Sequence, residues 1–347
     1  MKLVSLIVPC YNEDESVNLF YSVVNPILAE IKDIEYEFIY VNDGSKDETI
    51  QKIKHLSNKE SNVRFISFSR NFGKEAAMLA GIEAARGEAV ILMDVDLQDP
   101  PNLLPQMIQE WIEGKYDVIY TRRSNRSGEP PIRSWFARKF YKFINKMSDV
   151  HIVDGARDYR LMDRRVVESF LQLKEKNRFA KGLFMWVGYR TKCIEFENIE
   201  RAAGDSSWSF LKLVHYAIDG IVSFTISPLR WASYFGFFTA SSAFLYMFYI
   251  IFAKLYFGNE VSGYASIVSI MLFFGGLQLI FLGIIGEYIG RIFIEVKARP
   301  SYIVQEQSSF ALKKELSKPG LIVKGEFPSS IQRNIHKKKA LYLRRNS

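Results

Sequence analysis

The segment AVILMDVDLQDPP, residues 89–101, decides how the N-terminal part of the chain folds. Its first five residues, 89–93, have the length and apolar composition of a buried β-strand. Asp94 and Asp96 follow directly, so both carboxylates can turn toward one cation if the strand ends in a bend. Such oxygen ligands suit Mg²⁺ or Mn²⁺, which keep open positions for diphosphate oxygens. The Asp-x-Asp pattern is weak by itself, because solvated acidic turns are common.

Strand-like and helix-like segments alternate on both sides of this stretch. Short runs rich in β-formers cover residues 3–8, 38–42, 63–68, 89–93 and 118–120, and helix-like stretches between them cover residues 16–31, 46–57, 74–85 and 103–111. This order predicts an α/β domain with a largely parallel, Rossmann-like sheet covered on both faces. Ligands of such sheets bind beyond the carboxyl ends of the strands.

Polar clusters follow three of the predicted strands at those ends. They are Pro9-Cys10-Tyr11-Asn12-Glu13, Val41-Asn42-Asp43-Gly44-Ser45 and Asp94-Val95-Asp96. We therefore expect one polar crevice, in which Asp43 can accept hydrogen bonds from a base or ribose while Gly44 permits a tight turn. The chain has neither a Gly-x-Gly-x-x-Gly after the first strand nor a Gly-Lys-Ser/Thr loop, which disfavours a dinucleotide oxidoreductase and a P-loop ATPase.

Two uncharged apolar runs, residues 231–253 and 261–286, lie in the second half of the chain. Each is long enough to cross a hydrocarbon core of about 30 Å, which needs roughly 20 helical residues. Buried core helices are the alternative, but they rarely run that far without a charge. The sequence therefore predicts two transmembrane helices within residues 229–290.

The net charge of +8 is unevenly distributed. Residues 297–347 hold 12 Lys or Arg against 3 Asp or Glu, a net charge of +9, which leaves −1 for the remainder. Positive charge marks the cytoplasmic ends of membrane helices, so we predict a plasma-membrane protein with both termini and the N-terminal domain in the cytoplasm. The basic tail, residues 291–347, lacks a nucleic-acid recognition module, and attraction to anionic lipid or a solvated tail is favoured.

Two amphipathic segments precede the apolar runs. Residues 131–147 place apolar side chains at helical spacing between basic ones, which predicts a helix in the headgroup layer; a surface helix on the sheet is the alternative. Residues 210–228 indicate a second interfacial helix. The predicted organisation is a catalytic domain over residues 1–209, this second interfacial helix, two membrane helices and the tail. With only Cys10 and Cys193, no disulfide framework is expected.

The three polar clusters, taken with Asp94–Pro101 and Ser69-Arg70-Asn71-Phe72-Gly73-Lys74, resemble family 2 glycosyltransferases of the GT-A fold. More narrowly, they are similar to polyprenyl-phosphate glycosyltransferases, which include bactoprenol glucosyltransferases and dolichol-phosphate mannose synthases. Asp158-Tyr159-Arg160-Leu161-Met162-Asp163-Arg164 resembles their acceptor-loop motif. Gly286-Glu287-Tyr288-Ile289-Gly290-Arg291 resembles the membrane-exit segment of the two-span bacterial type. The resemblance covers roughly residues 3–302, and its motifs in order are highly specific.

The resemblance implies roles for individual residues. The nucleotide sugar would contact Pro9, Tyr11, Glu13, Asp43, Asp94, Gln98, Arg122 and Arg123, with one arginine of the last pair expected on a solvated surface. The metal, Mg²⁺ or Mn²⁺, would be held by Asp94, Asp96 and Gln98. The acceptor phosphate would contact Arg133, Arg160 and Arg201, and the catalytic residues would be Asp96, Asp158 and Arg160.

One position departs from the family pattern Arg-x-x-Gly-x-Ser-Lys followed by an aromatic residue. Arg201, Gly204, Ser206 and Trp208 fit that pattern, but Ser207 replaces the lysine. If the family lysine holds phosphate, this chain must use another cation or bind phosphate less tightly.

The implied activity is inverting transfer of a hexose from a UDP-sugar to undecaprenyl phosphate, giving a lipid-linked monosaccharide for cell-envelope glycans. UDP-glucose is the favoured donor and UDP-N-acetylglucosamine the next, while the downstream glycan is not specified. A processive polysaccharide synthase is an alternative, although Ser227 stands where the Gln of its Gln-x-x-Arg-Trp motif belongs. A second alternative is a catalytically weak nucleotide-binding scaffold for a flippase or transferase. Gly286 and Gly290 form a small-x-x-x-small pair that could support a homo-oligomer.

Overall fold

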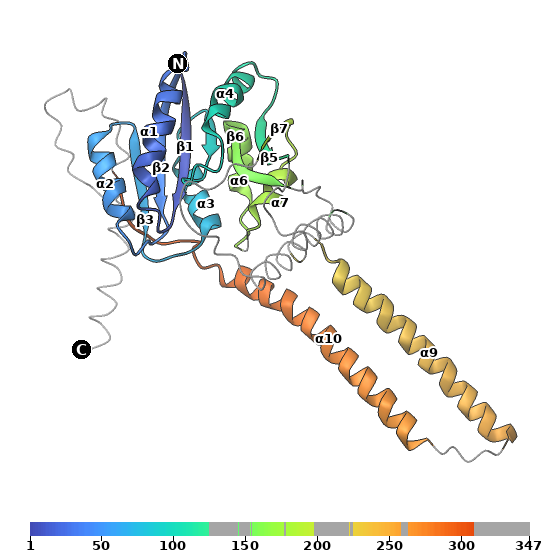
Figure 1. The fold of residues 1–347 in the computed structure, drawn as a ribbon. Helices are drawn as coiled ribbons and strands as arrows, with labels where there is room; N and C mark the ends of the chain where they lie inside the picture. The colour runs from blue at the N-terminus through green and yellow to red at the C-terminus, as the bar shows by residue number, and fades with distance from the viewer. Residues whose placement is uncertain are drawn as a thin grey trace, which may run out of the picture. The chain divides into compact units, whose positions relative to one another are not determined.

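The computed structural model describes residues 1–124, 145, 153, 155–176, 178–197, 222, 225–257 and 263–308, and residues 1–308 form one compact unit. Its strands are β1 Lys2–Cys10, β2 Ile34–Asn42, β3 Val63–Phe68, β4 Ala89–Leu92, β5 Val118–Arg123, β6 Ala156–Asp163, β7 Thr191–Phe196 and β8 Val304–Gln307. Its helices are α1 Ser16–Ala29, α2 Thr49–Lys59, α3 Lys74–Ala84, α4 Leu104–Ile112, α6 Arg164–Gln172, α7 Ala180–Trp186, α9 Ser227–Phe257 and α10 Tyr264–Lys297 (Figure 1).

The strands form one mostly parallel sheet in the order β7-β5-β6-β4-β1-β2-β3-β8. β1 pairs in parallel with β2 and β4, β2 with β3, and β5 with β7. Only β6 and β8, among the described strands, run antiparallel to their neighbours. The predicted α/β fold is confirmed, and the five strands and four helices expected over residues 3–120 are present.

Helices cover both faces of this sheet. On one face, Leu6 and Phe38 of the sheet lie in a buried cluster with Phe20 of α1, Ile53 of α2 and Met107 of α4. On the other face α3 packs closely on β1. A Cβ added to Gly81 of α3 would lie 2.2 Å from Cγ2 of Ile7, so α3 approaches the sheet only because residue 81 has no side chain.

The segment that resembles the acceptor-loop motif forms a β-strand. Residues 156–163 form β6, inserted between β4 and β5. Leu92 of β4 is paired with Arg160 of β6 in antiparallel register. Asp158 lies two residues before Arg160, and Asp94 lies two residues after Leu92, beyond the end of β4. The start of β6 therefore reaches the same edge of the sheet as the end of β4.

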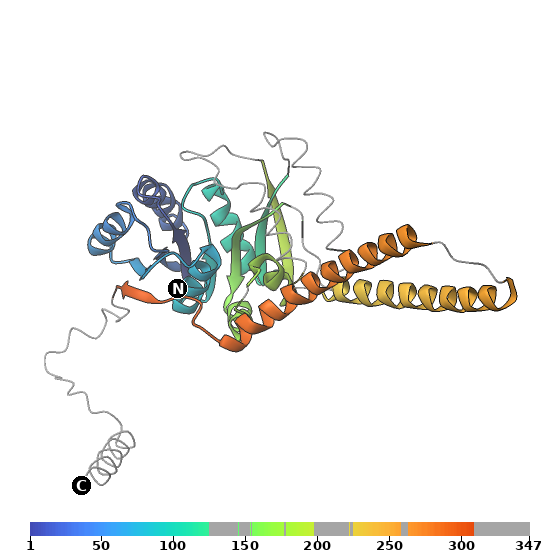
Figure 2. The same ribbon diagram turned by 90° about the horizontal axis from the view of Figure 1, so that it is seen from below.

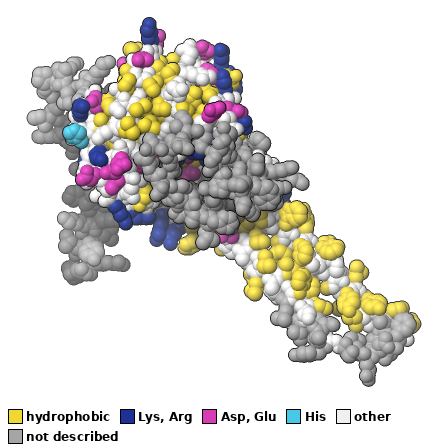
Figure 3. Space-filling model, viewed as in Figure 1, with side chains coloured by type: hydrophobic (Ala, Val, Ile, Leu, Met, Phe, Trp, Pro, Cys, Tyr) yellow, Lys and Arg dark blue, Asp and Glu magenta, His cyan; other side chains and the backbone are white. Residues whose placement is uncertain are grey.

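α9 and α10 are long and apolar enough to cross a membrane, judged by length and composition. The candidate spans cover Ser227–Phe252 and Ser269–Lys297. Hydrophobic side chains cover much of their described surface (Figure 3), and Phe235 contacts Phe281 with ring centroids 6.1 Å apart. Figure 2 shows the same two helices from a second direction. The second helix continues to Lys297, beyond the expected end of the membrane region at residue 290.

The expected start of the tail is also wrong. Residues 304–307 form β8, an edge strand paired with β3. The sequence of β8, Val-Gln-Glu-Gln, does not alternate apolar and polar residues, so no strand was predicted there. Its pairing with β3 depends on backbone hydrogen bonds, which a sequence pattern does not reveal. The remaining tail, residues 309–347, lies outside the described residues, as do the expected helix at 131–147 except for residue 145 and most of the expected interfacial helix at 210–228.

A buried ion pair under the sheet offers a test of this packing. Glu37 of β2 accepts from Ser5 Oγ at 2.6 Å and pairs with Arg64 of β3; both charged side chains are 7% exposed. Glu37→Ala would leave a buried guanidinium without its carboxylate, so we expect a loss of about 3–5 kcal/mol in the free energy of unfolding. Denaturant titration of the purified protein in detergent measures it. Lys115→Ala, which breaks an exposed pair with Glu113, should leave the denaturation midpoint unchanged. Equal shifts of the midpoint by the two substitutions would contradict a stabilising role of the buried Glu37–Arg64 pair.

Candidate active site

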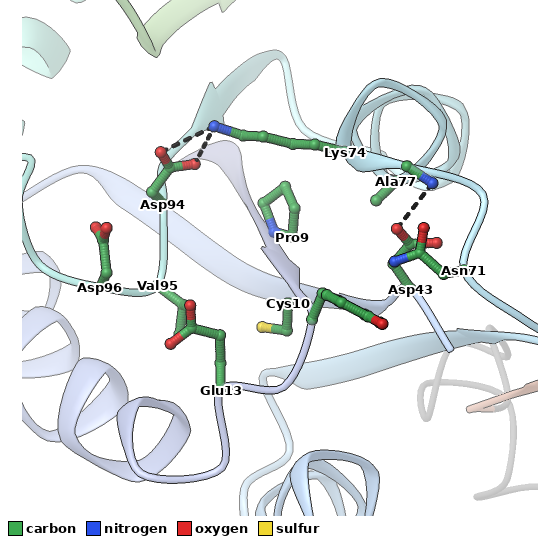
Figure 4. Close-up of a pocket in the computed structure, with 12 residues that line it drawn as sticks. Pro9, Cys10, Glu13, Asp43, Asn71, Lys74, Ala77, Asp94, Val95 and Asp96 are labelled. Carbon is green, nitrogen blue, oxygen red and sulfur yellow. Dashed lines mark hydrogen bonds and ion pairs between the residues drawn. The ribbon is translucent and has the colours of Figure 1, made fainter. Parts of the chain in front are cut away.

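A cleft of about 250 Å³ opens at the carboxyl ends of β1, β2 and β4 (Figure 4). Its lining includes all three polar clusters that the sequence singled out: Pro9, Cys10, Tyr11, Glu13, Asp43, Asn71, Gly73, Lys74, Ala77, Asp94, Val95 and Asp96. The predicted meeting of strand ends at one crevice is therefore confirmed for this part of the chain.

The loops after β1 and β2 are hydrogen-bonded to each other. Asn12, in a left-handed conformation with φ 54°, donates its N–H to Ser45 Oγ at 3.0 Å and accepts the Lys46 N–H at 2.9 Å. Glu13 donates its N–H to Thr49 Oγ1 at 2.8 Å. These bonds fix the segment that presents Tyr11, whose side chain is exposed, at the mouth of the cleft.

Asp43 anchors the loop that follows β3. Its carboxylate accepts the N–H of Phe72 at 2.6 Å and that of Gly73 at 2.9 Å, and the residue is only 3% exposed. Burial raises the pKa of Asp43 above its ordinary value, although the two N–H donors lower it. Gly44, with φ 64°, is required here, because a Cβ would lie 2.3 Å from the backbone carbon of Arg70.

Lys74 bridges two carboxylates at the cleft. Its Nζ lies 2.7 Å from Asp94 Oδ1 and 2.7 Å from Asp158 Oδ2, and its side chain is 43% exposed. Burial lowers the pKa of Lys74, but the charges of Asp158 and Asp94 outweigh burial and raise it. Burial raises the pKa of Asp158, but Lys74 and then Lys181 of α7 hold it well below its usual range. Lys74 is the last residue of the Ser69–Lys74 motif, but the sequence analysis assigned it no role in the site.

A second cation reaches the Asp-x-Asp segment from β6. Arg157 Nε donates to Asp99 Oδ1 at 2.9 Å, and its Nη2 lies 3.6 Å from Asp94 Oδ2. Asp99 is fully buried, so it holds the guanidinium beside the cleft. Sequence reasoning missed Arg157, although the residue directly precedes the motif that begins at Asp158.

The structure gives Arg160 contacts other than those expected of an acceptor-phosphate ligand. It is 1% exposed, and its guanidinium lies 3.9 Å from the ring centroid of Phe184. It donates to the backbone carbonyls of Arg157 and Asp158 at 2.9 and 3.2 Å. Arg160 therefore fixes the start of β6, and its side chain is directed away from solvent.

The other expected arginines divide into two groups. Arg122 pairs with Glu195 of β7, whereas Arg123 donates to Gln98 Oε1 at 3.1 Å and so reaches the Asp-x-Asp segment. Arg133 and Arg201, together with Ser207, lie outside the described residues.

The donor set fits a divalent cation shared with a diphosphate. Within the described ranges no group of three or more His, Cys, Asp or Glu side chains could hold a metal alone. Asp94 and Asp96 supply two carboxylates on one short segment, and Mg²⁺ is typically bound by one or two carboxylates plus phosphate oxygens and water. Gln98 is a weaker candidate, because its oxygen accepts from Arg123. A cation bound at Asp94 would have to displace the Lys74 ammonium or share the carboxylate with it, since Nζ lies 2.7 Å from Oδ1.

Comparison with known proteins agrees with this geometry. Residues 5–171 match the model of glycosyl transferase family 2, and residues 227–292 match that of the GtrB C-terminal hairpin. The SfII prophage-derived bactoprenol glucosyl transferase of Shigella flexneri is 46% identical over 87% of this chain and 97% of its own length. The bactoprenol glucosyl transferase of Shigella phage SfV is 45% identical over 88% of this chain and 98% of its own.

A third relative comes from a different bacterial lineage. CsbB of Bacillus subtilis (strain 168), which carries a glycosyltransferase name, is 48% identical over 88% of this chain and 92% of its own length. Identity at this level spans the sheet, the cleft and the helical hairpin together. The chain therefore belongs to glycosyl transferase family 2 and is a glycosyltransferase with a GT-A catalytic domain.

Proposed function

We propose that this enzyme transfers glucose from UDP-glucose to a polyprenyl phosphate in the cytoplasmic leaflet of the plasma membrane. One observation carries the proposal: Lys74 joins Asp94 of the Asp-x-Asp segment to Asp158 of the acceptor motif at a single cleft. The names of the Shigella relatives supply the substrate class, a bactoprenol acceptor and a glucosyl group.

The strand that follows the second long helix supports the membrane topology. β8 pairs with β3, so the residues after α10 and the residues before α9 belong to the same sheet. The chain must therefore cross a membrane an even number of times between them, as two spans do. The basic residues after Lys297 favour the cytoplasm for that side.

The cleft would bind the donor in two parts. Tyr11, Glu13 and Asp43 would surround the uridine, with Asp43 acting mainly through the loop it anchors. Asp94 and Asp96 would hold Mg²⁺ or Mn²⁺ against the diphosphate. The bound metal would neutralise charge developing on the leaving UDP.

The acceptor needs no general base. A phosphate monoester has a second pKa of about 6, so near neutral pH it is mostly a dianion. One of its oxygens would attack the anomeric carbon as the bond from that carbon to the diphosphate oxygen breaks, which inverts the configuration and releases UDP. Lys74 and Arg157 would stabilise the phosphate oxygens, and Asp158 would orient Lys74.

Three cations near the cleft could replace the family lysine that is absent at Ser207. They are Lys74, Arg157 and Lys181. All three interact with the acidic groups around Asp158 or Asp94. We propose that these cations hold phosphate in place of the lysine that Ser207 replaces. A homo-oligomer through Gly286 and Gly290 and a flippase partner stay predictions from the sequence.

Membranes containing this protein, supplied with undecaprenyl phosphate, Mg²⁺ and labelled nucleotide sugars, test the function directly. We expect a labelled lipid from UDP-glucose, and Asp96→Ala should reduce turnover at least about a hundredfold, because a group acting on transition-state charge is lost. Glu35→Ala, which removes an exposed acid that does not line the cleft, is the matched control. A product only with UDP-N-acetylglucosamine would correct the donor, and no product despite UDP binding would support the scaffold alternative.

Lys74→Met tests the bridging cation. We expect kcat to fall roughly a hundredfold, since an electrostatic donor to the reacting phosphates is removed. UDP affinity, measured by titration calorimetry, should change much less. Lys115→Met, on an exposed side chain, should leave both quantities unchanged. Full turnover by Lys74→Met would exclude a catalytic role.

Glu75, next to Lys74, predicts a pH-dependent stability. Its carboxylate accepts the Ala180 N–H at 3.2 Å, and burial, followed by the charge of Asp158, raises its pKa to about 7. A raised carboxyl pKa means that the folded state loses stability as pH rises from the unfolded pKa of about 4.3 through 7. Glu75→Gln keeps an acceptor and avoids that loss, so its melting temperature should match the wild type at pH 5 and exceed it at pH 8. Glu35→Gln, on an exposed side chain, should have the same melting temperature as the wild type at both pH values. If Glu75→Gln differed from the wild type by the same amount at pH 5 and pH 8, a raised pKa of Glu75 would be refuted.

A further inference from the structure

The segment that leaves the second long helix returns at once to the sheet. We call residues 298–308 the return strap. Ala298, with φ 48°, ends α10, and β8 begins only seven residues after Lys297. Seven residues span at most about 25 Å, so the end of α10 is held close to the β3 edge of the sheet.

The return strap binds the sheet through backbone and aromatic contacts. Ser69 donates its N–H to the Ile303 carbonyl at 3.0 Å. The ring of Tyr302 stacks on Phe68, the last residue of β3, with centroids 4.8 Å apart and planes 17° apart. Its hydroxyl is hydrogen-bonded to Glu83 of α3. Tyr302 therefore joins the two elements that flank the loop of residues 69–73.

That loop is part of the cleft. Phe68 contacts Phe72 edge to face, with centroids 5.8 Å apart, and Phe72 donates its N–H to Asp43 at 2.6 Å. Lys74 begins α3 directly after the loop. A continuous series of contacts thus runs from Tyr302 through Phe68 and Phe72 to Asp43.

We infer that Tyr302 is a positioning residue for donor binding, through which the membrane-exit segment sets the shape of the nucleotide pocket. The inference rests on the proposed function, since it assigns the donor nucleotide to this cleft. Tyr302 itself does not line the cleft; it acts by holding β3 and α3 at the separation that lets Phe72 and Gly73 bind Asp43. Because one aromatic pair is lost when Tyr302 is replaced by Ala, we expect UDP to bind roughly three- to tenfold more weakly.

The experiment compares full-length Tyr302→Ala, Tyr302→Phe and Lys54→Ala in detergent. UDP affinity with Mg²⁺ is measured by calorimetry, and KM is measured separately for UDP-glucose and for undecaprenyl phosphate. Tyr302→Ala should raise the UDP Kd and the UDP-glucose KM about three- to tenfold while the acceptor KM stays constant. Tyr302→Phe keeps the stacked ring and should restore donor binding. Lys54→Ala removes a pair with Glu306 of β8, 2.7 Å long, away from the loop, and should behave as wild type.

Hydrogen exchange separates this inference from the proposed function. In Tyr302→Ala the amides of Phe72 and Gly73 should exchange faster, whether or not UDP binds. An unchanged UDP Kd with unchanged exchange would overturn the inference, as would an equal loss for donor and acceptor that Tyr302→Phe fails to rescue. Absence of UDP binding by the wild type, with the exchange effect present, would instead reject the proposed donor site.

Discussion

Two carboxylates, one just after β4 and one in β6, are joined by a single ammonium group at the cleft. Asp94 Oδ1 and Asp158 Oδ2 each lie 2.7 Å from Lys74 Nζ, so they are no more than about 5.4 Å apart. Without the lysine, their repulsion would be roughly 3 kcal/mol at an effective dielectric constant of about 20. The position of Lys74, set by the loop that Asp43 anchors, is therefore a condition for bringing donor and acceptor motifs together.

The direction of β6 explains why these motifs meet. A parallel strand delivers its last residues to the carboxyl edge of a sheet, whereas an antiparallel strand delivers its first. Asp158 lies near the start of β6, two residues before the Arg160 that pairs with Leu92 at the end of β4, and Lys74 links it to Asp94. Arg157 reaches the same edge, and buried Asp99 holds it there. Cations from β6 and α3 thus offset the acids in the absence of any ligand.

The parts that could be predicted from the sequence are those in which local pattern and environment agree. β1 to β4 are nearly continuous apolar runs, and a polar cluster directly follows each of β1, β2 and β4. β6 was missed as a strand because Arg157, Asp158 and Arg160 interrupt its apolar pattern, yet it lies inside the sheet between β5 and β4. The role of Lys74 depends on Asp158, 84 residues away in the chain, and no local spacing encodes that contact.

In the sequence, the hairpin formed by α9 and α10 lies between β7 and β8, two strands of the same sheet. Its second helix is followed by a short strap that pairs with β3, so movement of that helix relative to the domain is limited by the length of the strap. Lys176, in the segment between α6 and α7, also donates its N–H to Glu295 near the end of α10 at 2.7 Å. One end of the hairpin is therefore tied both to the segment preceding α7, the helix that carries Lys181, and, through Tyr302, to the loop that holds Asp43. If the acceptor is the membrane lipid proposed above, such ties would fix the cleft relative to the two candidate spans and replace a diffusional search with a defined approach.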